Sequence, residues 1–461
     1  MKAAVIGGGI SGLAAAWELL KEGVDVELFE GAERVGGVIH TTRRGPYLFE
    51  SGPNTVMATL PSFYSLVDEL GLREDMLVVP PEDSERYLYF KGSLHPLPKS
   101  FKEFLKTDLF TWPQKLRVLM EPLIPKGDPD HEETVAEWFG RRIGRGLTMT
   151  WIDIVVTGIY AGNPNMLGIQ SAFPDLHAME EKYGSVFKAM KARAQERREK
   201  GGRKTAMVSF KQGLQQMIDA LSEKLGERIH LRHAIRRIAT DASGGFALTI
   251  QEPGGLEEEA RFDRVVMAVP AQTAGILLAE VAPEVSDLLF EIESVDMVVV
   301  QAGFDREALP GLPHGFGFLI PRSMRMRTLG WIFSSEIFPQ QNPEGKVSMI
   351  GMMGGALDPQ CLHVSDEQIQ HLMLGELALC LDQSKTPSPE VFEPIRWKGA
   401  IPQYNVGHKR RIEAVKTLLA GQAPGLSLAG NWVEGVSVEK CIDRGRRAAL
   451  EVLAREVGAE T

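Results

Sequence analysis

The N-terminal segment combines two short apolar runs with a helical pattern between them. Residues 2–6 form an apolar run that stops at glycine, which is typical of a buried parallel strand. In residues 11–22 apolar side chains recur at helical spacing, and Gly23 follows as a stop signal. Residues 24–30 then alternate apolar and acidic positions, which predicts a second strand. The chain is therefore expected to open with a right-handed strand–helix–strand unit.

The remainder of the chain changes character several times. Residues 86–98 predict a hairpin followed by a proline-bounded loop, and residues 97–205 are mostly helical in pattern. A basic run at 191–204 within that part is interpreted as a solvated helix end or loop. Residues 425–432 predict a strand that ends in a glycine turn, followed by a helix from about Val438. Strand character also returns in three shorter runs, at residues 229–238, 247–251 and 261–269.

A glycine-rich loop connects the first predicted strand to the first helix. In GGGISG (residues 7–12), Gly7 allows a tight turn, Gly9 lets the backbone approach a pyrophosphate, and Gly12 lets helix and strand pack closely. The N-terminus of the helix adds free N–H groups and a partial positive charge. Glu30 ends the second strand, where its carboxylate can accept hydrogen bonds from both ribose hydroxyls and would repel a 2′-phosphate. Together these features favour a dinucleotide site over a glycine-rich packing turn.

The order of these elements predicts an α/β fold combined with α+β parts. A Rossmann-like, dinucleotide-binding domain would be built from discontinuous segments, because one nucleotide-type unit opens the chain and a similar strand–turn–helix closes it. A mixed α+β substrate domain and a helical insertion would lie between them. The predicted segments are 1–75, 206–270 and 397–461 for the dinucleotide domain, 76–96 and 271–396 for the substrate domain, and 97–205 for the helical domain.

Composition excludes several classes of function. The 461 residues carry a net charge of −10, so we expect no nucleic-acid partner. The three cysteines, Cys361, Cys380 and Cys441, are too few and too scattered for a disulfide framework or a zinc site, and we expect no metal and a reducing, cytoplasmic compartment. We also expect neither a secretory signal nor a membrane span.

Three further motifs carry a family resemblance. Arg34-Val35-Gly36-Gly37 follows the acid at Glu30, Gly52-Pro53-Asn54-Thr55 closes a later loop, and Leu428–Asn431 precedes Glu434–Val438 near the end of the chain. These motifs resemble the monoamine-oxidase-like flavoproteins, which implies non-covalent FAD. The residues expected to bind FAD are Gly7, Gly8, Gly9, Ile10, Ser11, Gly12, Glu30, Arg34, Gly36, Gly37, Val38, Gly52, Pro53, Asn54, Thr55, Ile235, Asn431, Val436, Ser437 and Val438.

The resemblance also assigns roles to some of these residues. It implies that Arg34 and the paired glycines line the pyrophosphate and ribityl chain, that Ile235 contacts the adenine, and that the helix after Ser437 points its N-terminus at the isoalloxazine ring. That helix would stabilise negative charge on a reduced flavin. Residues 268–270 would close over the cofactor. A surface salt bridge for Arg34 and plain strand core for Ile235 are the alternatives.

Within this superfamily the chain is similar to the protoporphyrinogen oxidase family from its first strand to its last helix. The motifs that carry this likeness are YAGN at 160–163 with SAFP at 171–174, GFGFLIP at 315–321, IPQY at 401–404 with GH at 407–408, and GVSV at 435–438 with CI at 441–442. The resemblance implies that Arg86 pairs with a substrate propionate, that Phe316 and Leu319 sandwich the macrocycle, and that the carbonyl of Gly158 faces the reacting centre. The alternatives are an exposed strand charge for Arg86 and ordinary core for the two apolar residues.

The activity implied by this family is the oxidation of a substrate by the bound flavin. A hydride passes from a meso carbon of protoporphyrinogen IX to flavin N5, a pyrrole nitrogen loses a proton, and O2 reoxidises the flavin to give hydrogen peroxide. Coproporphyrinogen III is the alternative substrate, and Lys91, Lys99 and Lys182 would serve its additional carboxylates or be solvated. No general base is assigned, since His95, His177 and His408 are isolated and interpreted as structural.

Other interpretations stay open from the sequence. A flavin amine oxidase and a non-catalytic flavin-binding protein are the rival functions, although Cys441 does not occupy the position at which amine oxidases attach flavin. Residues 101–124 mix aromatic residues, leucines and lysines, which fits either peripheral contact with the inner face of the cytoplasmic membrane or an amphipathic helix pair packed on the core. The family resemblance further implies a homodimer.

Overall fold

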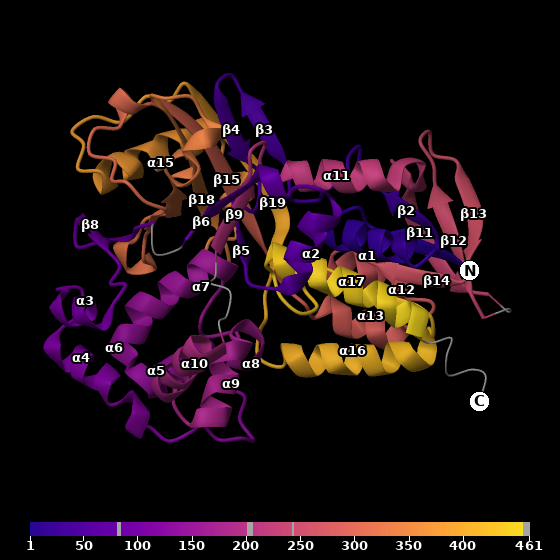
Figure 1. Cartoon of the computed structure of the whole chain (residues 1–461), viewed down its shortest axis with the longest axis horizontal. Helices are drawn as coiled ribbons and strands as arrows, with labels where there is room; N and C mark the ends of the chain where they lie inside the picture. The colour runs from indigo at the N-terminus through magenta and orange to yellow at the C-terminus, as the bar shows by residue number, and fades with distance from the viewer. Residues whose placement is uncertain (81–83, 201–205, 242–243, 455–461) are drawn as a thin grey trace.

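A computed structural model of the chain describes residues 1–80, 84–200, 206–241 and 244–454. A parallel sheet with its helices occupies one end of the molecule (Figure 1, right), and a mixed sheet lies above a group of helices at the other end. The predicted combination of an α/β part, an α+β part and a helical insertion is confirmed.

The parallel sheet brings the two ends of the chain together. Its strand order is β10 (Ile229–Leu231), β2 (Asp25–Glu30), β1 (Lys2–Ile6), β14 (Arg264–Met267) and β20 (Leu426–Leu428). All neighbouring strands in it run parallel. The sheet is covered on both faces, which is why β1 is apolar along its length rather than alternating. The opening strand–helix–strand unit and the closing strand are therefore confirmed.

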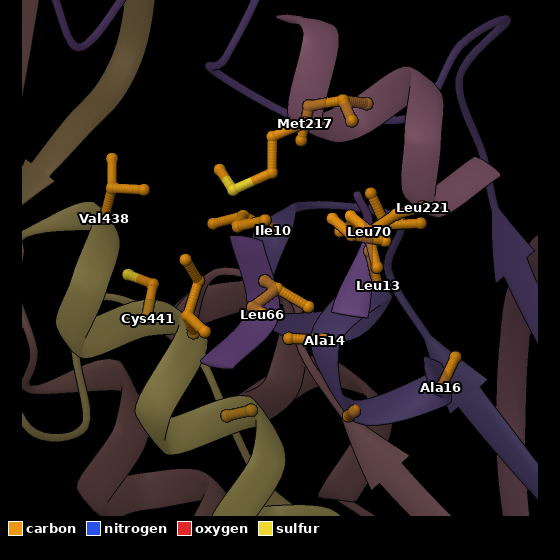
Figure 2. Packing of buried hydrophobic residues seen from close by; sticks show 14 of the residues in the cluster. Ile10, Leu13, Ala14, Ala16, Leu66, Leu70, Met217, Leu221, Val438 and Cys441 are labelled. Atoms are coloured by element: carbon orange, nitrogen blue, oxygen red, sulfur yellow. The ribbon is translucent and has the colours of Figure 1, made fainter. Parts of the chain in front are cut away.

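The first and last helices pack directly against each other on one face of this sheet. α1 (Ile10–Lys21) and α17 (Val438–Ala454) approach so closely that a Cβ on Gly445 would lie 2.2 Å from the carbonyl oxygen of Ser11. Figure 2 shows Ile10 and Leu13 of α1 in the same cluster as Cys441 of α17. The helices α2 (Pro61–Glu69) and α11 (Gln215–Leu225) complete this layer. The start of α1 is consequently packed against the first half of α17.

The other face of the parallel sheet is covered by three helices and a small antiparallel sheet. The helices are α12 (Ala271–Leu278), α13 (Pro283–Phe290) and α16 (His408–Gln422). The small sheet contains β11 (Ala234–Thr240), β12 (Phe246–Gln251) and β13 (Glu257–Phe262). Two minor sheets, β3 (Thr41–Arg44) with β4 (Tyr47–Glu50) and β5 (Val56–Ala58) with β9 (Ala206–Phe210) and β6 (Met76–Val79), lie between the two ends of the molecule.

The mixed sheet has seven strands. In order they are β19 (Val391–Pro402), β15 (Ser294–Asp305), β18 (Lys346–Gly354), β17 (Thr328–Ile332), β16 (Gly317–Leu319), β7 (Arg86–Phe90) and β8 (Ser93–Pro96). The predicted hairpin is the β7–β8 pair, and β7 adds to β16 in parallel. α15 (Asp366–Cys380) packs its apolar side chains on this sheet.

The segment predicted to be mostly helical is helical. It contains α3 (Phe101–Lys106), α4 (Trp112–Leu119), α5 (Val135–Ile143), α6 (Arg145–Leu147), α7 (Asp153–Tyr160), α8 (Ile169–Ala172), α9 (Pro174–Tyr183) and α10 (Val186–Lys200). A π-helical turn, Thr148–Ile152, leads directly into α7. The basic run begins inside α10, and its last part, residues 201–204, lies outside the described residues.

The division into three domains stays a prediction, but two of its boundaries need to move. We assigned residues 271–290 to the substrate domain, whereas α12 and α13 pack on the parallel sheet. Conversely, residues 397–402 were placed in the dinucleotide domain, whereas they belong to β19 of the mixed sheet. Periodicity shows that a segment is helical and apolar on one face, but it does not show which sheet that face covers.

Candidate functional site

The glycine loop after β1 is shaped by close contacts within the protein. Gly7 has a φ of +102°, and a Cβ there would lie 2.6 Å from the carbonyl oxygen of Ala268. A Cβ on Gly12 would lie 1.9 Å from the carbonyl oxygen of Gly7. The loop and the first turn of α1 therefore leave no space for side chains at these two positions.

Gly9 differs from its neighbours in a way that indicates a binding site. Its φ of −68° suits any residue, and a Cβ added there would meet no protein atom within 4 Å. Gly9 is also the N-cap of α1, which has no side-chain cap and no acidic residue in its first turn. The glycine thus opens a cradle in front of a helix N-terminus, which suits a phosphate group.

Glu30 is oriented by the backbone around it. Its carboxylate accepts hydrogen bonds from the N–H groups of Gly8 (2.7 Å) and Ala32 (2.8 Å). The N–H of His233 donates to the carbonyl oxygen of Glu30, which brings the start of β11, with the half-buried Ile235, beside the end of β2. The acid and the expected adenine contact are therefore close to each other.

Arg34 organises the loop that follows β2. Its guanidinium donates to the carbonyl oxygens of Val35 (3.0 Å), Ile39 (3.2 Å) and Gly37 (2.7 Å). Burial lowers its pKa, opposed by the nearby charge of Glu30. In the described part of the chain no carboxylate forms an ion pair with this guanidinium, so the alternative of a surface salt bridge does not apply. Arg34 holds the paired glycines in place.

These loops meet around the cradle. The N–H of Gly36 donates to the carbonyl oxygen of Gly8 (2.7 Å), and a Cβ on Gly37 would lie 3.4 Å from the Cα of Gly9. Val38 follows with an exposed side chain, and a Cβ on Gly52 would lie 2.2 Å from its carbonyl oxygen. The residues Pro53, Asn54 and Thr55 continue from there and are half-buried. The three N-terminal motifs are therefore adjacent in space.

The C-terminal motif lies in the loop before α17 and in the first turn of that helix. Asn431, Val436 and Ser437 are partly or fully exposed in the loop before α17, which begins at Val438. In its first turn Glu439 is buried and accepts three hydrogen bonds from the Thr59 N–H (2.7 Å), the Thr59 hydroxyl (2.7 Å) and the Leu60 N–H (3.0 Å). Sequence reasoning missed this residue, because its partners are 380 positions away in the chain.

The cysteines lie away from the exposed surface of these loops. Cys361, Cys380 and Cys441 are free and buried. Burial raises the pKa of Cys441 to about 11, and its side chain lies in the α1–α17 cluster of Figure 2. This arrangement offers no thiol for attachment of a cofactor.

Arg86 and Phe316 lie together on the mixed sheet. Arg86 begins β7 opposite Gly317 of β16, and its guanidinium lies 5.2 Å from the centre of the Phe316 ring. Burial lowers the pKa of Arg86. Among the described residues no carboxylate pairs with it, and its other recorded contact is the Met207 sulfur at 3.7 Å. Arg86 is exposed at the start of β7, so its guanidinium, although partly shielded from water, is accessible to an incoming carboxylate.

Leu319 and Gly158 form a second contact in the same region. A Cβ on Gly158 would lie 3.0 Å from Cδ1 of Leu319, so α7 packs closely on β16 at this point. Val155 and Ile159, which flank Gly158 on α7, are 41% and 45% exposed. Sequence reasoning did not single out these two residues, although their spacing places them on one helical face. They add exposed apolar side chains to α7 on either side of Gly158 in the sequence.

Comparison with known proteins identifies the class of the molecule. A family model described as flavin containing amine oxidoreductase matches residues 10–453. The chloroplastic protoporphyrinogen oxidase of Nicotiana tabacum is 31% identical over 97% of this chain and 84% of its own length. The coproporphyrinogen III oxidase of Bacillus subtilis is 29% identical over 97% of both chains. A crystal structure from Exiguobacterium, provisionally described as a protoporphyrinogen oxidase, has a TM-score of 0.82 at 26% identity and covers 99% of both chains.

Proposed function

Because the chain belongs to the flavin-containing amine oxidoreductase family, we propose that it is an FAD-dependent, oxygen-requiring enzyme that oxidises protoporphyrinogen IX to protoporphyrin IX. The observation that carries this proposal is the combination of a phosphate cradle at Gly9 with an exposed arginine, Arg86, that lies over Phe316 and has no carboxylate partner among the described residues. Expected contacts of individual residues with FAD and with the porphyrinogen stay predictions.

The residues of the chain have separate tasks in this reaction. FAD supplies the two-electron acceptor, and O2 regenerates it as hydrogen peroxide forms. Arg86 binds a propionate of the substrate with two parallel hydrogen bonds. Phe316 and Leu319 cover the flat macrocycle and exclude water, and the absence of a side chain at Gly158 lets Leu319 pack close to α7. The aromatic product supplies much of the driving force, so the protein needs to position the substrate rather than provide a strong acid or base.

Coproporphyrinogen III is the second candidate substrate, because the Bacillus subtilis relative named for it matches along its whole length. Its two additional propionates would need further cations. Lys99 is bound to Glu85 (2.6 Å), Lys182 lies over the ring of Tyr183, and Lys91 lies over the ring of Phe90. These contacts support the substrate with two propionates as the main one.

The choice among the candidate functions can be tested on the flavin itself. We expect anaerobic addition of protoporphyrinogen IX to bleach the visible flavin absorption, whereas primary amines leave the flavin oxidised. Readmission of O2 should restore the flavin absorption and allow the repeated two-electron cycles that yield the fluorescent porphyrin. Coproporphyrinogen III should react about tenfold more slowly, corresponding to the ~1.4 kcal/mol cost of one poorly compensated carboxylate. Faster reaction with coproporphyrinogen III would select the alternative substrate. Reduction by amines would select an amine oxidase, and reduction by none of these compounds would leave a flavin-binding protein.

We also propose that the FAD is held without a covalent bond. The three cysteines are buried in the protein, and none lies on the exposed loops of the cradle. Acid precipitation of the purified protein is the direct check, because it releases non-covalent flavin into the supernatant and retains attached flavin in the pellet.

A peripheral contact with membranes is a further part of the proposal. Within the described residues no helix combines the length and the apolar character that crossing a bilayer requires. The segment 101–124 packs on the core through Phe104 of α3, Leu109 and Phe110 of the loop between α3 and α4, and Val118 of α4. The same segment exposes Phe101, Trp112, Leu116, Leu119, Met120 and Leu123. Lys102 and Lys106 are exposed beside these residues, which suits an anionic lipid surface.

Flotation with anionic liposomes tests this contact. We expect the protein to float with the vesicles, and the double variant Trp112→Ser/Leu123→Ser to bind at least about tenfold more weakly, because each side chain contributes roughly 1–2 kcal/mol of apolar burial. Leu357→Ser/Leu379→Ser, at two other exposed leucines, is the matched control and should float normally. Equal flotation of both variants, or none by the wild type, would contradict membrane contact by this surface. The homodimer implied by the resemblance stays a prediction.

A further inference from the structure

The segment 401–408, IPQYNVGH, contributes three buried polar side chains whose role the proposed function does not explain. Gln403, Tyr404 and His408 are 4%, 2% and 2% exposed. The rings of Tyr404 and His408 are stacked, with centroids 4.2 Å apart and planes inclined by 13°. Buried polar groups of this kind need hydrogen-bond partners, and the partners they have lie in two different parts of the site.

On one side the segment holds the loop that leads into α17. The Tyr404 hydroxyl donates to the carbonyl oxygen of Asn431 (2.6 Å), and a backbone hydrogen bond from Gly435 also reaches the phenol. His408 Nε2 lies 2.9 Å from the carbonyl oxygen of Trp432, which accepts only, so Nε2 carries the proton. Two consecutive carbonyl groups of the expected flavin loop are thus held by one stacked pair of rings.

On the other side the segment holds the C-terminal end of α7. Gln403 Nε2 donates to the carbonyl oxygen of Tyr160 (2.9 Å), the last residue of α7. The ring of Tyr160 also contacts the ring of Tyr404, with centroids 5.7 Å apart. Gly158, the residue that faces Leu319, is two positions earlier in the same helix. Adjacent residues of one segment are therefore bonded to the substrate side and to the flavin side.

We propose that Gln403, Tyr404 and His408 are positioning residues that lock α7 to the loop Asn431–Gly435 and thereby set the distance between bound porphyrinogen and flavin. The proposal deepens the proposed function and rests on it for the substrate. The part of the proposal that concerns the loop Asn431–Gly435 depends only on FAD binding and not on which substrate is used.

The chemistry of the three groups suits a rigid connection. Burial lowers the pKa of His408 to about 4, so the imidazole is uncharged near neutral pH and its bond to Trp432 is a neutral one. Arg411 is the charged group that also acts on it, in the same direction, and the Tyr404 phenol faces it with a pKa raised well above its usual range by burial. The connection therefore keeps the same protonation state across the neutral range. Loss of one bond leaves a buried carbonyl group without a donor.

The flavin side is tested by comparing two tyrosine variants. Tyr404→Phe removes the hydroxyl bonded to Asn431, whereas Tyr160→Phe removes an equally buried hydroxyl bonded to the carbonyl oxygen of Ala172 (2.8 Å). We expect Tyr404→Phe to raise the dissociation constant for FAD about tenfold and to change the fine structure of the visible flavin band. Tyr160→Phe should change the dissociation constant less than about twofold, although both variants lose thermal stability. Equal effects of the two variants on FAD binding would overturn the proposal.

The connection between the two sides is tested with Gln403→Met, which keeps the approximate volume but removes the bond to α7. We expect it to lower kcat about tenfold while the dissociation constant for FAD changes less than about twofold. The double variant Gln403→Met/Tyr404→Phe should lower kcat no further than the worse single variant, because either change alone breaks the same connection. If the kcat of the double variant fell by the product of the two single reductions, the coupling between α7 and the loop Asn431–Gly435 would be contradicted. If porphyrinogens fail to reduce the wild-type flavin, the comparison of Tyr404→Phe with Tyr160→Phe still decides the flavin part.

Discussion

Replacing Gly9 by valine is expected to abolish FAD binding in a protein that still folds. The position has an ordinary φ of −68°, and a Cβ there meets no protein atom within 4 Å, so the folded chain accepts a side chain. The same Cβ would occupy the space in front of the α1 N-terminus where the pyrophosphate is expected to lie. We expect the dissociation constant for FAD to rise at least about 100-fold, equivalent to ~2.7 kcal/mol, measured by quenching of FAD fluorescence on titration into apoprotein.

The stability of the Gly9→Val apoprotein distinguishes a blocked site from a damaged fold. Valine is a poorer N-cap than glycine, so we expect a loss of about 1 kcal/mol in the free energy of unfolding. Gly12→Ala provides the contrast, because its Cβ would lie 1.9 Å from the carbonyl oxygen of Gly7 and the backbone would have to move. The variant at Gly12 should unfold at lower temperature even without FAD. Undiminished FAD binding by Gly9→Val would refute the assignment of the cradle.

Replacing Arg86 by alanine is expected to weaken use of the porphyrinogen while leaving FAD in place. The guanidinium is partly desolvated, lies over Phe316, and has no carboxylate partner among the described residues. A charge-assisted pair with a propionate would contribute about 1.5–3 kcal/mol, so kcat/KM should fall about 10- to 100-fold, mainly through KM. Because no ion pair of Arg86 lies within the described residues, its removal should not lower the stability of the apoprotein.

Two comparisons show whether Arg86 acts on the carboxylate. The dimethyl ester of protoporphyrinogen IX lacks the charge, so Arg86→Ala should change kcat/KM for the ester less than about threefold. Arg86→Lys retains the positive charge without the planar pair of donors and should recover part of the loss. An equal loss with the free acid and with the ester would mean that Arg86 shapes the pocket rather than binding the substrate. A fall in FAD affinity would place it at the cofactor instead.

The flavin site illustrates how far sequence patterns reach. Glycines at positions 7, 9 and 12 with an acid at 30 predict the cradle, because the turn, the helix and the acid are close in sequence and their geometry is local. The structure adds a distinction that the pattern does not contain. Gly7 and Gly12 are required by protein atoms, whereas the space beside Gly9 is open.

Other features of the site depend on contacts between distant parts of the chain. Nothing near Glu439 in the sequence indicates that it binds Thr59 and Leu60. The motif at 401–408 was noticed by resemblance, but its link between Tyr160 and Asn431 becomes visible only when the three segments are brought together. The sequence likewise does not show that α12 and α13 pack on the parallel sheet, since an apolar helix face fits either sheet.

The amino-acid sequence by itself determined the local elements of this protein, the phosphate-binding turn and the residue types available for chemistry. Each of these depends on backbone geometry over a few neighbouring positions, which spacing and side-chain type record directly. The tertiary structure alone decided which elements share a core, that Arg86 lies over Phe316 with no acidic partner in the described part of the chain, and that one buried segment joins the two sides of the site. These properties arise from packing and desolvation between residues hundreds of positions apart, and no local pattern encodes them.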